Sequence, residues 1–319
     1  MQIRHSLILL LTATIWGVAF VAQSVGMEYV GPFTFLCARS VIGGCILLPV
    51  IAALRRSSTP PHEAPAQARH SRKMLLRGGV CCGVMLCLSS ASQQIGLLYT
   101  TVGKAGFLTA CYILIVPLIG LLFGKKCGRL VWCGVALALV GLYLLCLTGG
   151  LRVNTGDLLM LLCAVLFSCH ILLVDHFSPH VDGVKMSCIQ FFVCAAAAAV
   201  GVVLFELPDA PLNRFGFAAP SWDALRAAWQ PVLYAGALSS GVGYTLQIIG
   251  QRGINPAVAS LIMSLESVIS VIAGWLLLGQ TLTARELCGC ALMFIAILLA
   301  QLPDTGGNPQ DSGQTGTPA

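Results

Sequence analysis

The stretch PAVASLIMSLESVISVIAGWLLL, residues 256–278, decides the fold of this chain. Its 23 residues include one charged side chain, that of Glu266. An α-helix needs about 20 mainly apolar residues to cross the hydrocarbon core of a bilayer. The Asn255-Pro256 dipeptide directly before the stretch is a typical helix boundary. The stretch is therefore predicted to be one transmembrane helix.

Nine other stretches have the same character, which makes this an all-α polytopic membrane protein with ten transmembrane helices. Hydrophobic residues form 57% of the 319 and charged residues 9%, with a mean hydropathy of +0.88, whereas a soluble domain is about 25% charged. No period-two alternation predicts a barrel strand. The expected spans are 5–25, 32–54, 75–97, 103–123, 130–147, 156–176, 185–205, 230–250, 256–278 and 284–302.

Three segments lie outside the predicted spans. Residues 55–73 are rich in proline, serine and charge and predict a cytoplasmic loop, and residues 303–319 predict a disordered cytoplasmic tail. Residues 206–228 are the longest remaining loop, with a short amphipathic piece expected around Trp222 to Trp229 at the membrane interface. The first apolar run is too long for a cleaved signal peptide and lacks a cleavage site.

Lysine and arginine counts predict the orientation. With the N-terminus inside, cytoplasmic segments hold twelve of these residues and outer segments hold five, as the positive-inside rule requires. The bias comes from the first half of the chain. An even number of spans then places both termini in the cytoplasm, and we expect a multi-pass protein of a bacterial inner (plasma) membrane, in contact with the lipid bilayer. The net charge of +6 lacks a basic stripe interleaved with aromatic residues, so no nucleic-acid partner is expected.

The fifteen cysteines do not predict a metal site or a disulfide framework. Nearly all lie inside apolar runs, where cysteine behaves as a small hydrophobic residue. Cys81–Cys82 and Cys288/Cys290 lack the histidine or second cysteine pair that zinc requires. We expect no metal and no cofactor.

The two halves of the chain resemble each other. Aligning LTATIWGVAF with LCAVLFSCHI places Trp16 over Phe167 at an offset of 151, and the same offset places Arg39 over Gln190. Aligning LLFGKKCGRLVWCG with LLLGQTLTARELCG places Gly124 over Gly279 at an offset of 155. One altered loop length would account for the drift of four residues.

A repeat of five spans has a mechanical consequence. Because five is odd, the second copy enters the membrane from the opposite side, and inverted repeats are a common architecture of secondary transporters. We expect one repeat over residues 5–147, a second over 156–302, and a substrate site near the midplane between them.

Four stretches carry a resemblance to a known family. These are ATIWGVAFVAQ (13–23), the arginine in LCARSVIGG (36–44), YTTVGKAGFLTACYILIVPLIGLLFGKK (99–126) and GINPAVASLIMSLESVISVIAGWLLLGQTLT (253–283). Over about residues 8–302 the chain resembles the drug/metabolite transporter superfamily, specifically its ten-helix EamA-type members. It departs from the family pattern at Ser267, where proline is usual, and at Gln280 and Lys125, where an acidic residue usually ends the span.

The resemblance implies a secondary active transporter rather than an enzyme. We expect it to move a small polar metabolite, such as an amino-acid-like compound, across the plasma membrane by alternating access, and to work in export. No GxxxxGK[ST] motif is present for ATP. The alternatives are a lipid-linked sugar flippase, whose relatives are usually shorter four-helix chains, and an integral-membrane enzyme, which typically gathers the histidines that are scattered here. The oligomeric state stays open, a homodimer included.

Ionisable residues inside a span are site candidates, because each costs roughly 2.5–3.5 kcal/mol at the helix centre. Glu266 is a candidate for proton coupling or for binding a substrate cation, or else it is paired structurally. Arg39 reaches the headgroups, pairs with Glu266 or binds a substrate carboxylate. His170 relays protons or simply packs. Residues at span ends are expected to be solvated at the interface: Glu28, Lys104, Asp175 and Glu206.

Neutral polar residues supply the other candidates. Tyr244 and Gln247 lie at helical spacing in the eighth span, on a face suited either to a polar solute or to hydrogen bonds between helices. In the fourth span, Pro117 predicts a kink. Further candidates for the cavity wall are Trp16, Gln23, Gln94, Tyr112 and Gln190.

Overall fold

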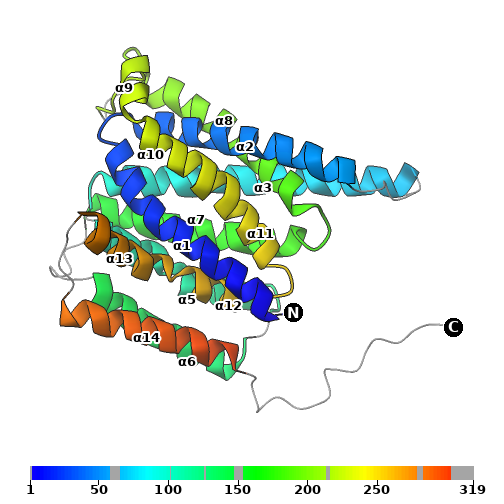
Figure 1. The fold of residues 1–319 in the computed structure, drawn as a ribbon, viewed down its shortest axis with the longest axis vertical. Helices are drawn as coiled ribbons and strands as arrows, with labels where there is room; N and C mark the ends of the chain where they lie inside the picture. The colour runs from blue at the N-terminus through cyan, green and yellow to red at the C-terminus, as the bar shows by residue number, and fades with distance from the viewer. Residues whose placement is uncertain are drawn as a thin grey trace.

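The computed structural model describes residues 2–57, 65–100, 102–125, 127–146, 154–212, 216–278 and 283–302. These residues form helices joined by turns and short loops, and no strand occurs among them. The predicted tail over 303–319 and Gln280 lie outside the described residues. Figure 1 shows the helices packed roughly side by side along one common direction.

The helices make ten passes, which confirms the predicted fold class. The first five passes are α1 (Gln2–Gly26), α2 (Pro32–Ser57), α3 (Pro65–Leu97), α4 (Val102–Ala110) with α5 (Tyr112–Leu122), and α6 (Arg129–Cys146). The second five are α7 (Thr155–Phe177), α8 (Gly183–Phe205), α10 (Trp229–Leu233) with η2 (Tyr234–Tyr244) and α11 (Thr245–Gly250), α12 (Pro256–Met263) with α13 (Glu266–Leu278), and α14 (Ala284–Gln301). Seven of the described passes are long and apolar enough to cross a membrane by themselves, and two shorter apolar helices lie beside them.

Local sequence explains where these helices begin. Asn154 and Asp157 form a reciprocal capping box at the start of α7, and Thr283 and Glu286 form one at the start of α14. Such boxes satisfy backbone N–H groups that have no partner within the helix. Asn255 caps α12, whose first residue is Pro256, the first-turn position that proline tolerates best. The short α9 (Trp222–Ala227) forms at the predicted interfacial piece, with Trp222 exposed.

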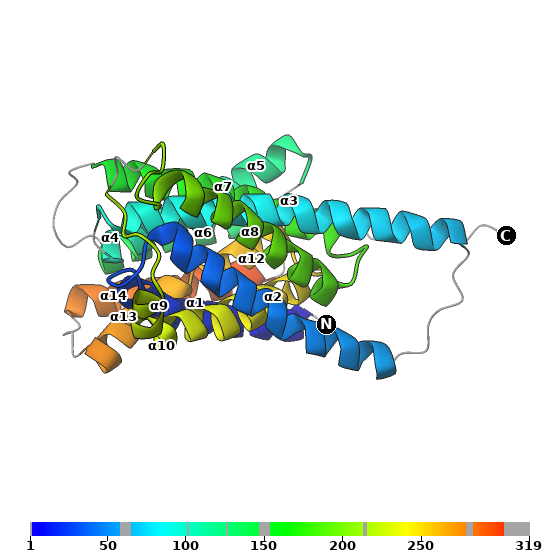
Figure 2. The same ribbon diagram turned by 90° about the horizontal axis from the view of Figure 1, so that it is seen from above.

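The connection between α2 and α3 differs from the predicted loop over 55–73. Helix α2 continues to Ser57 and α3 begins at Pro65, so helix replaces loop on both sides of residues 58–64, which lie outside the described part of the chain. The stretch after Pro65 contains alanine, glutamine and arginine, which favour helix once proline has taken the first position. Figure 2 shows α3 extending past the rest of the bundle.

Packing between the halves follows a two-fold pattern. A Cβ atom on Gly96 would lie 3.1–3.2 Å from atoms of Met160 and Leu159, and one on Gly250 would lie 2.9–3.0 Å from atoms of Leu9 and Ile8. Gly250 is the counterpart of Gly96 at an offset of 154, and residues 159 and 160 are the counterparts of 8 and 9 at the predicted offset of 151. The contact of α3 with α7 therefore recurs as a contact of α11 with α1, in which the first and second halves have exchanged roles.

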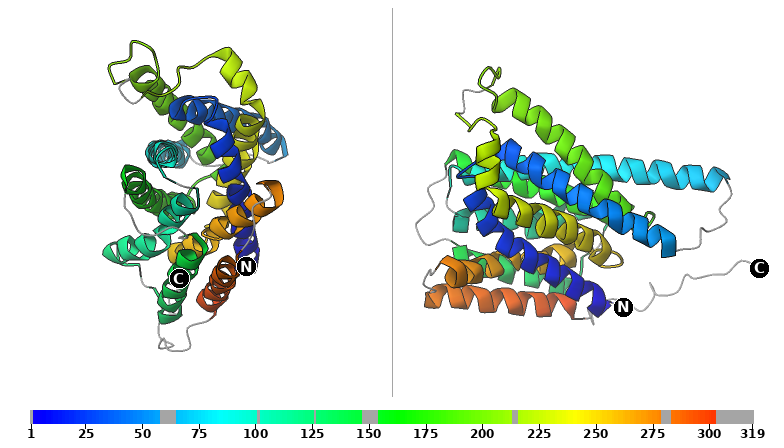
Figure 3. Two further views of the ribbon diagram at one scale, coloured as in Figure 1. Left: turned by 90° about the vertical axis from the view of Figure 1, so that its left-hand side faces the viewer. Right: turned by 45° about the horizontal axis from the view of Figure 1, so that its top comes forward.

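The α6–α14 pair obeys the same symmetry. A Cβ atom on Gly134 would lie 2.8 Å from the carbonyl oxygen of Ala296, and one on Gly141 would lie 2.9 Å from that of Gly289. An offset of 155 converts one contact into the other. The two helices lie side by side at one edge of the molecule (Figure 3). Helices α1 and α7 run in opposite directions (Figure 1), as an inverted repeat requires.

Two passes are interrupted at matching places. The fourth breaks at Cys111 between α4 and α5, and the ninth breaks between α12 and α13 at Ser264–Leu265. Pro117, at which the sequence predicts a kink, lies inside α5, after the interruption. Breaks of this kind near the midplane expose backbone groups where the halves meet.

The eighth pass contains a long π-helical segment, η2, that the sequence did not predict. Gly83 and Gly96 in α3 are 13 positions apart, and their counterparts Gly236 and Gly250 are 14 positions apart. A π-helix accommodates an extra residue by widening the turn. Part of the offset drift that was assigned to a loop therefore lies inside this helix.

Candidate functional site

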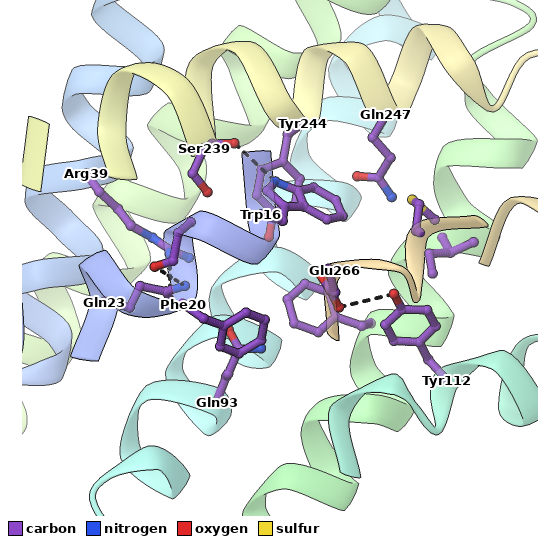
Figure 4. A pocket seen from close by; sticks show the side chains of 14 residues that line it. Trp16, Phe20, Gln23, Arg39, Gln93, Tyr112, Ser239, Tyr244, Gln247 and Glu266 are labelled. Atoms are coloured by element: carbon purple, nitrogen blue, oxygen red, sulfur yellow. Dashed lines mark hydrogen bonds between the residues drawn. The ribbon is translucent and has the colours of Figure 1, made fainter. Parts of the chain in front are cut away.

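A small cavity lies where the two halves meet, and most of the predicted site residues line it (Figure 4). Its volume is about 40 Å³, which is room for a few water molecules. Seven of the ten candidates contribute to the wall: Trp16, Gln23, Arg39, Tyr112, Tyr244, Gln247 and Glu266. The wall is completed by Ala19, Phe20, Gln93, Phe167, Ile171, Ser239 and Met263.

Several of these residues are counterparts in the two repeats. Trp16 faces the cavity with Phe167, and Phe20 faces it with Ile171, both pairs at an offset of 151. Gln93 and Gln247 form a third pair at 154. The wall therefore surrounds the pseudo-two-fold axis. Arg39 and Glu266 are among the wall residues without such a partner, because Gln190 and Cys111 occupy their equivalent places and are not part of the wall.

Glu266 is the first residue of α13, directly after the interruption of the ninth pass. Its side chain is buried, and its Oε1 accepts a hydrogen bond of 3.1 Å from Tyr112 Oη, at the start of α5. The unpaired N–H groups of a helix start favour a carboxylate nearby. Each interrupted pass thus contributes the first side chain of its second helix to one hydrogen bond between the halves.

Arg39 is 4% exposed and its guanidinium is held inside the protein. Nη1 donates to Gln23 Oε1 and Nη2 to Ser90 Oγ, each at 3.0 Å, and Nε has no hydrogen-bond partner. The hypothesis that Arg39 reaches the headgroups is therefore wrong. The ion pairs of the described residues do not include one between Arg39 and Glu266, so of the predicted roles only carboxylate binding stays open.

Two aromatic rings in tilted contact form the middle of the wall. The ring centroids of Trp16 and Tyr244 are 4.6 Å apart, and Trp16 Nε1 donates to the carbonyl oxygen of Ser239 at 3.2 Å. Ser239 lies in η2, where widened turns leave carbonyls able to accept from side chains. A Cβ atom at Gly243 would lie 2.7 Å from Trp16 Nε1. The absence of a side chain at 243 therefore lets the indole approach.

The other three candidates are buried away from the cavity wall. His170 Nε2 lies 3.3 Å from Gln190 Oε1, and the His170 ring packs edge-on against Tyr244 with centroids 5.9 Å apart. Neither amide atom of the fully buried Gln94 has a hydrogen-bond partner. His170 therefore supports Tyr244 from behind, and it is Gln93, beside Gln94, that reaches the cavity.

Sequence reasoning missed Gln93, Ser239 and the apolar part of the wall. The repeat carries a signal that would have found several of them. Once Trp16 is a candidate, its counterpart Phe167 follows from the offset of 151, whereas Gln93 follows from Gln247 only at the offset of 154 that the structure gives. Ser239 contributes through its backbone carbonyl, which no side-chain pattern reveals.

Contacts between the halves also close the two ends of the bundle. At one end the carboxylate of Glu206 accepts from Phe33 N at 2.6 Å, Thr34 N at 3.0 Å and Thr34 Oγ at 2.5 Å. Burial raises the pKa of Glu206, against the opposing effect of these hydrogen bonds. At the other end Lys125 forms an ion pair with Asp175. The expectation that Glu206 and Asp175 are simply solvated at helix ends is wrong.

The arrangement offers hydrogen-bonding groups and two opposite charges rather than a metal centre. Across the described parts of the chain, no group of three histidine, cysteine or acidic side chains is placed to hold a metal ion.

Comparison with known proteins places this architecture in a family. A sequence profile described as the EamA-like transporter family matches residues 4–147 and again residues 154–302. The chain belongs to the EamA-like transporter family. It is therefore a multi-pass membrane protein with a role in transport, as the resemblance of its motifs implied.

Relatives of this EamA-like chain carry the same general description. A protein of Archaeoglobus fulgidus described as an uncharacterized transporter is 26% identical over 295 residues, covering 92% of this chain and 84% of its own length. The Escherichia coli K12 protein YedA, described as an uncharacterized inner membrane transporter, is 24% identical over 293 residues, covering 90% and 87%. A crystal structure with 19% identity superposes with a TM-score of 0.70 over 93% of this chain and 96% of that one, which supports the fold.

Proposed function

We propose that the protein is a secondary transporter that moves a small polar metabolite across the plasma membrane by alternating access around the cavity between its halves. The observation that carries this proposal is the composition of the wall. It pairs repeat counterparts such as Trp16 and Phe167 around the axis, yet holds Arg39 and Glu266 as unmatched charges. A ligand bound on the axis contacts both halves, so it can favour one arrangement of them over another.

The small volume of the cavity supports a mechanism in which the two halves move relative to each other. Pockets for small molecules usually enclose about 300–1,000 Å³, whereas this one encloses about 40 Å³. A metabolite therefore needs the halves to separate at one end. The contacts of Glu206 at one end and of Lys125 with Asp175 at the other would have to open in turn.

The polar wall favours a solute with hydrogen-bonding groups, and an amino-acid-like compound has suitable ones. Gln93 and Gln247 offer amides, Tyr112 a hydroxyl, and Arg39 and Glu266 opposite charges. Export, an inner-membrane location and cytoplasmic termini belong to the same proposal. The described inner-membrane relative supports the location, and the charge bias of the first half supports the cytoplasmic termini.

Overexpression followed by reconstitution tests the proposal. Metabolites that accumulate outside overproducing cells are identified first, and the flux of each is then measured with purified protein in liposomes. Ala19→Leu adds volume to the cavity wall and should abolish flux, whereas Ala52→Leu, at an exposed position of α2, should leave it intact. No flux above empty liposomes for any accumulated metabolite would overturn the proposal.

A further inference from the structure

Arg39 and Glu266 line one cavity but do not pair. Arg39 is engaged by Gln23 and Ser90, and Glu266 is engaged by Tyr112. No contact between the two charges is found among the ion pairs of the residues that the structure describes. Each of the two ionisable side chains is therefore held by neutral partners rather than by the other.

The rings of Trp16 and Tyr244, tilted against each other at 51°, lie in the middle of the cavity wall. In Figure 4 the two rings lie between Arg39 and Gln247, and Glu266 lies below them beside Tyr112. The hydrogen bond from Trp16 to Ser239 fixes the indole in this place. The Arg39 end and the Gln247 end of the cavity are therefore separated by two aromatic side chains, of which Trp16 is fixed by a hydrogen bond.

Two buried polar atoms at these ends have no partner. They are Arg39 Nε, a donor, and Gln247 Oε1, an acceptor. A buried polar atom left unpaired costs about 1–3 kcal/mol. A ligand that presents an acceptor at the Arg39 end and a donor at the Gln247 end would satisfy both.

We propose that the substrate is an ω-amino carboxylate, with its carboxylate at Arg39 and its ammonium group at Glu266 and Gln247. Guanidinium binds carboxylate through parallel N–H donors, and an ammonium group has three donors to share among nearby oxygens. The inference rests on the proposed function and deepens it by naming the substrate class.

Other charge patterns fit the site less well. An α-amino acid carries both charges on one carbon, so it can engage one end of the site but not both. A dicarboxylate places like charge at Glu266, and a diamine places like charge at Arg39. The apolar wall residues Phe20, Ile171 and Met263 suit the methylene chain that joins the two groups of an ω-amino carboxylate.

Isomeric probes separate these classes. Binding to the purified full-length protein is measured by calorimetry with 5-aminopentanoate, its α-amino isomer norvaline, pentanedioate and pentane-1,5-diamine. We expect 5-aminopentanoate to bind at least about tenfold more tightly than each of the other three, a difference of about 1.4 kcal/mol. Equal or tighter binding of norvaline, or no binding of 5-aminopentanoate, would overturn the inference.

Variants test the assignment of the two ends. Arg39→Gln should remove the preference over the diamine, and Glu266→Gln should remove the preference over the dicarboxylate. Glu28→Gln, at an exposed position, is the control and should keep both. These are changes in selectivity among probes, which loss of folding does not produce, and a thermal melt of each variant verifies that it is folded.

The outcome is distinguishable from failure of the proposed function. If liposomes containing the protein transport an accumulated metabolite while 5-aminopentanoate neither binds nor competes, the substrate class is wrong and transport stands. If no metabolite is transported at all, the proposed function fails together with the inference.

Discussion

The hydrogen bond from Tyr112 to Glu266 joins the two halves at their axis, where each interrupted pass resumes as helix. A carboxylate at this position is well placed to respond both to a proton and to a substrate. Replacing Glu266 with glutamine is an informative change, because glutamine keeps the shape of the side chain and can still accept a hydrogen bond from Tyr112 but removes the titratable charge.

We expect Glu266→Gln to insert and fold but to lose pH-driven accumulation of the substrate, because no titratable group then remains at this position. Glu266→Ala should impair transport as well, since it also removes the hydrogen bond to Tyr112. The measurement is flux in liposomes with and without a pH gradient. Normal gradient-driven flux in the glutamine variant would exclude Glu266 as the coupling residue and leave Arg39 and the Tyr244/Gln247 face as the candidates.

Gly243→Ala should displace Trp16, because the added Cβ would lie 2.7 Å from its Nε1. Overpacking of this kind costs about 1–3 kcal/mol, and we expect a lower melting temperature together with reduced transport. Gly120→Ala is the matched control, since the nearest atom to its Cβ would be Lys125 Cβ at 3.7 Å. Equal transport by the two variants would show that the position of the indole is unimportant.

Sequence reasoning located the charged residues of the site better than its neutral ones. Glu266 and Arg39 stand out because a charge within a span is costly. The sequence prediction named Gln94, whereas Gln93 lines the cavity, and the rotation of α3 against its neighbours decides which of the two faces the axis. The partners of Arg39 lie on α1 and α3, so they depend on packing that a single span does not encode.

At the scale of elements, the start of α2 is held by the end of α8. Glu206 accepts from two backbone N–H groups and one hydroxyl there, so a carboxylate from one half caps a helix of the other. Gly31 is close enough that a Cβ atom on it would lie 2.5 Å from the carboxylate.

This contact predicts a pH dependence. The pKa of Glu206 is raised by burial, so the folded protein holds the proton more tightly than the unfolded chain does. The stability it contributes is then present at low pH and lost as the pH rises through the folded pKa. We expect the melting temperature of the wild type to rise more than that of Glu206→Gln when the pH is lowered from about 7 to about 5. Parallel curves for the two proteins would contradict this.

The ends of elements were predicted less well than the elements themselves. Hydrophobic length fixes where a span must lie. Helix α3 nevertheless begins before the expected span and includes Arg69 and Arg72, because a helix can extend out of the membrane into water. The break at Cys111 has no proline or glycine at the break itself. It is explained by its counterpart at Ser264–Leu265 on the same axis, which is a property of the assembled halves.

At the scale of the whole molecule, the ends of the described chain fall on one side of the bundle. Helix α1 starts and α14 finishes at the same end in Figure 1. Ten passes and the first-half charge bias predict that this end is cytoplasmic.

A topology reporter that is active only outside the cytoplasm tests this orientation. Fused after Ala319, it should be silent, whereas fused within residues 206–228 it should be active. Activity at both positions would mean that the chain crosses the membrane an odd number of times. Silence within 206–228 combined with activity after Ala319 would reverse the orientation.

The extra residue of the eighth pass has a thermodynamic consequence in the proposed mechanism. Two identical inverted halves would give inward-open and outward-open forms of equal free energy, so neither would be preferred at rest. The π-helix of η2, present in one half, removes that degeneracy, as do Arg39 and Glu266. A difference of only about 1.4 kcal/mol would place roughly ten molecules in one form for each in the other. The resting protein should therefore face predominantly one side of the membrane before any substrate or gradient acts on it.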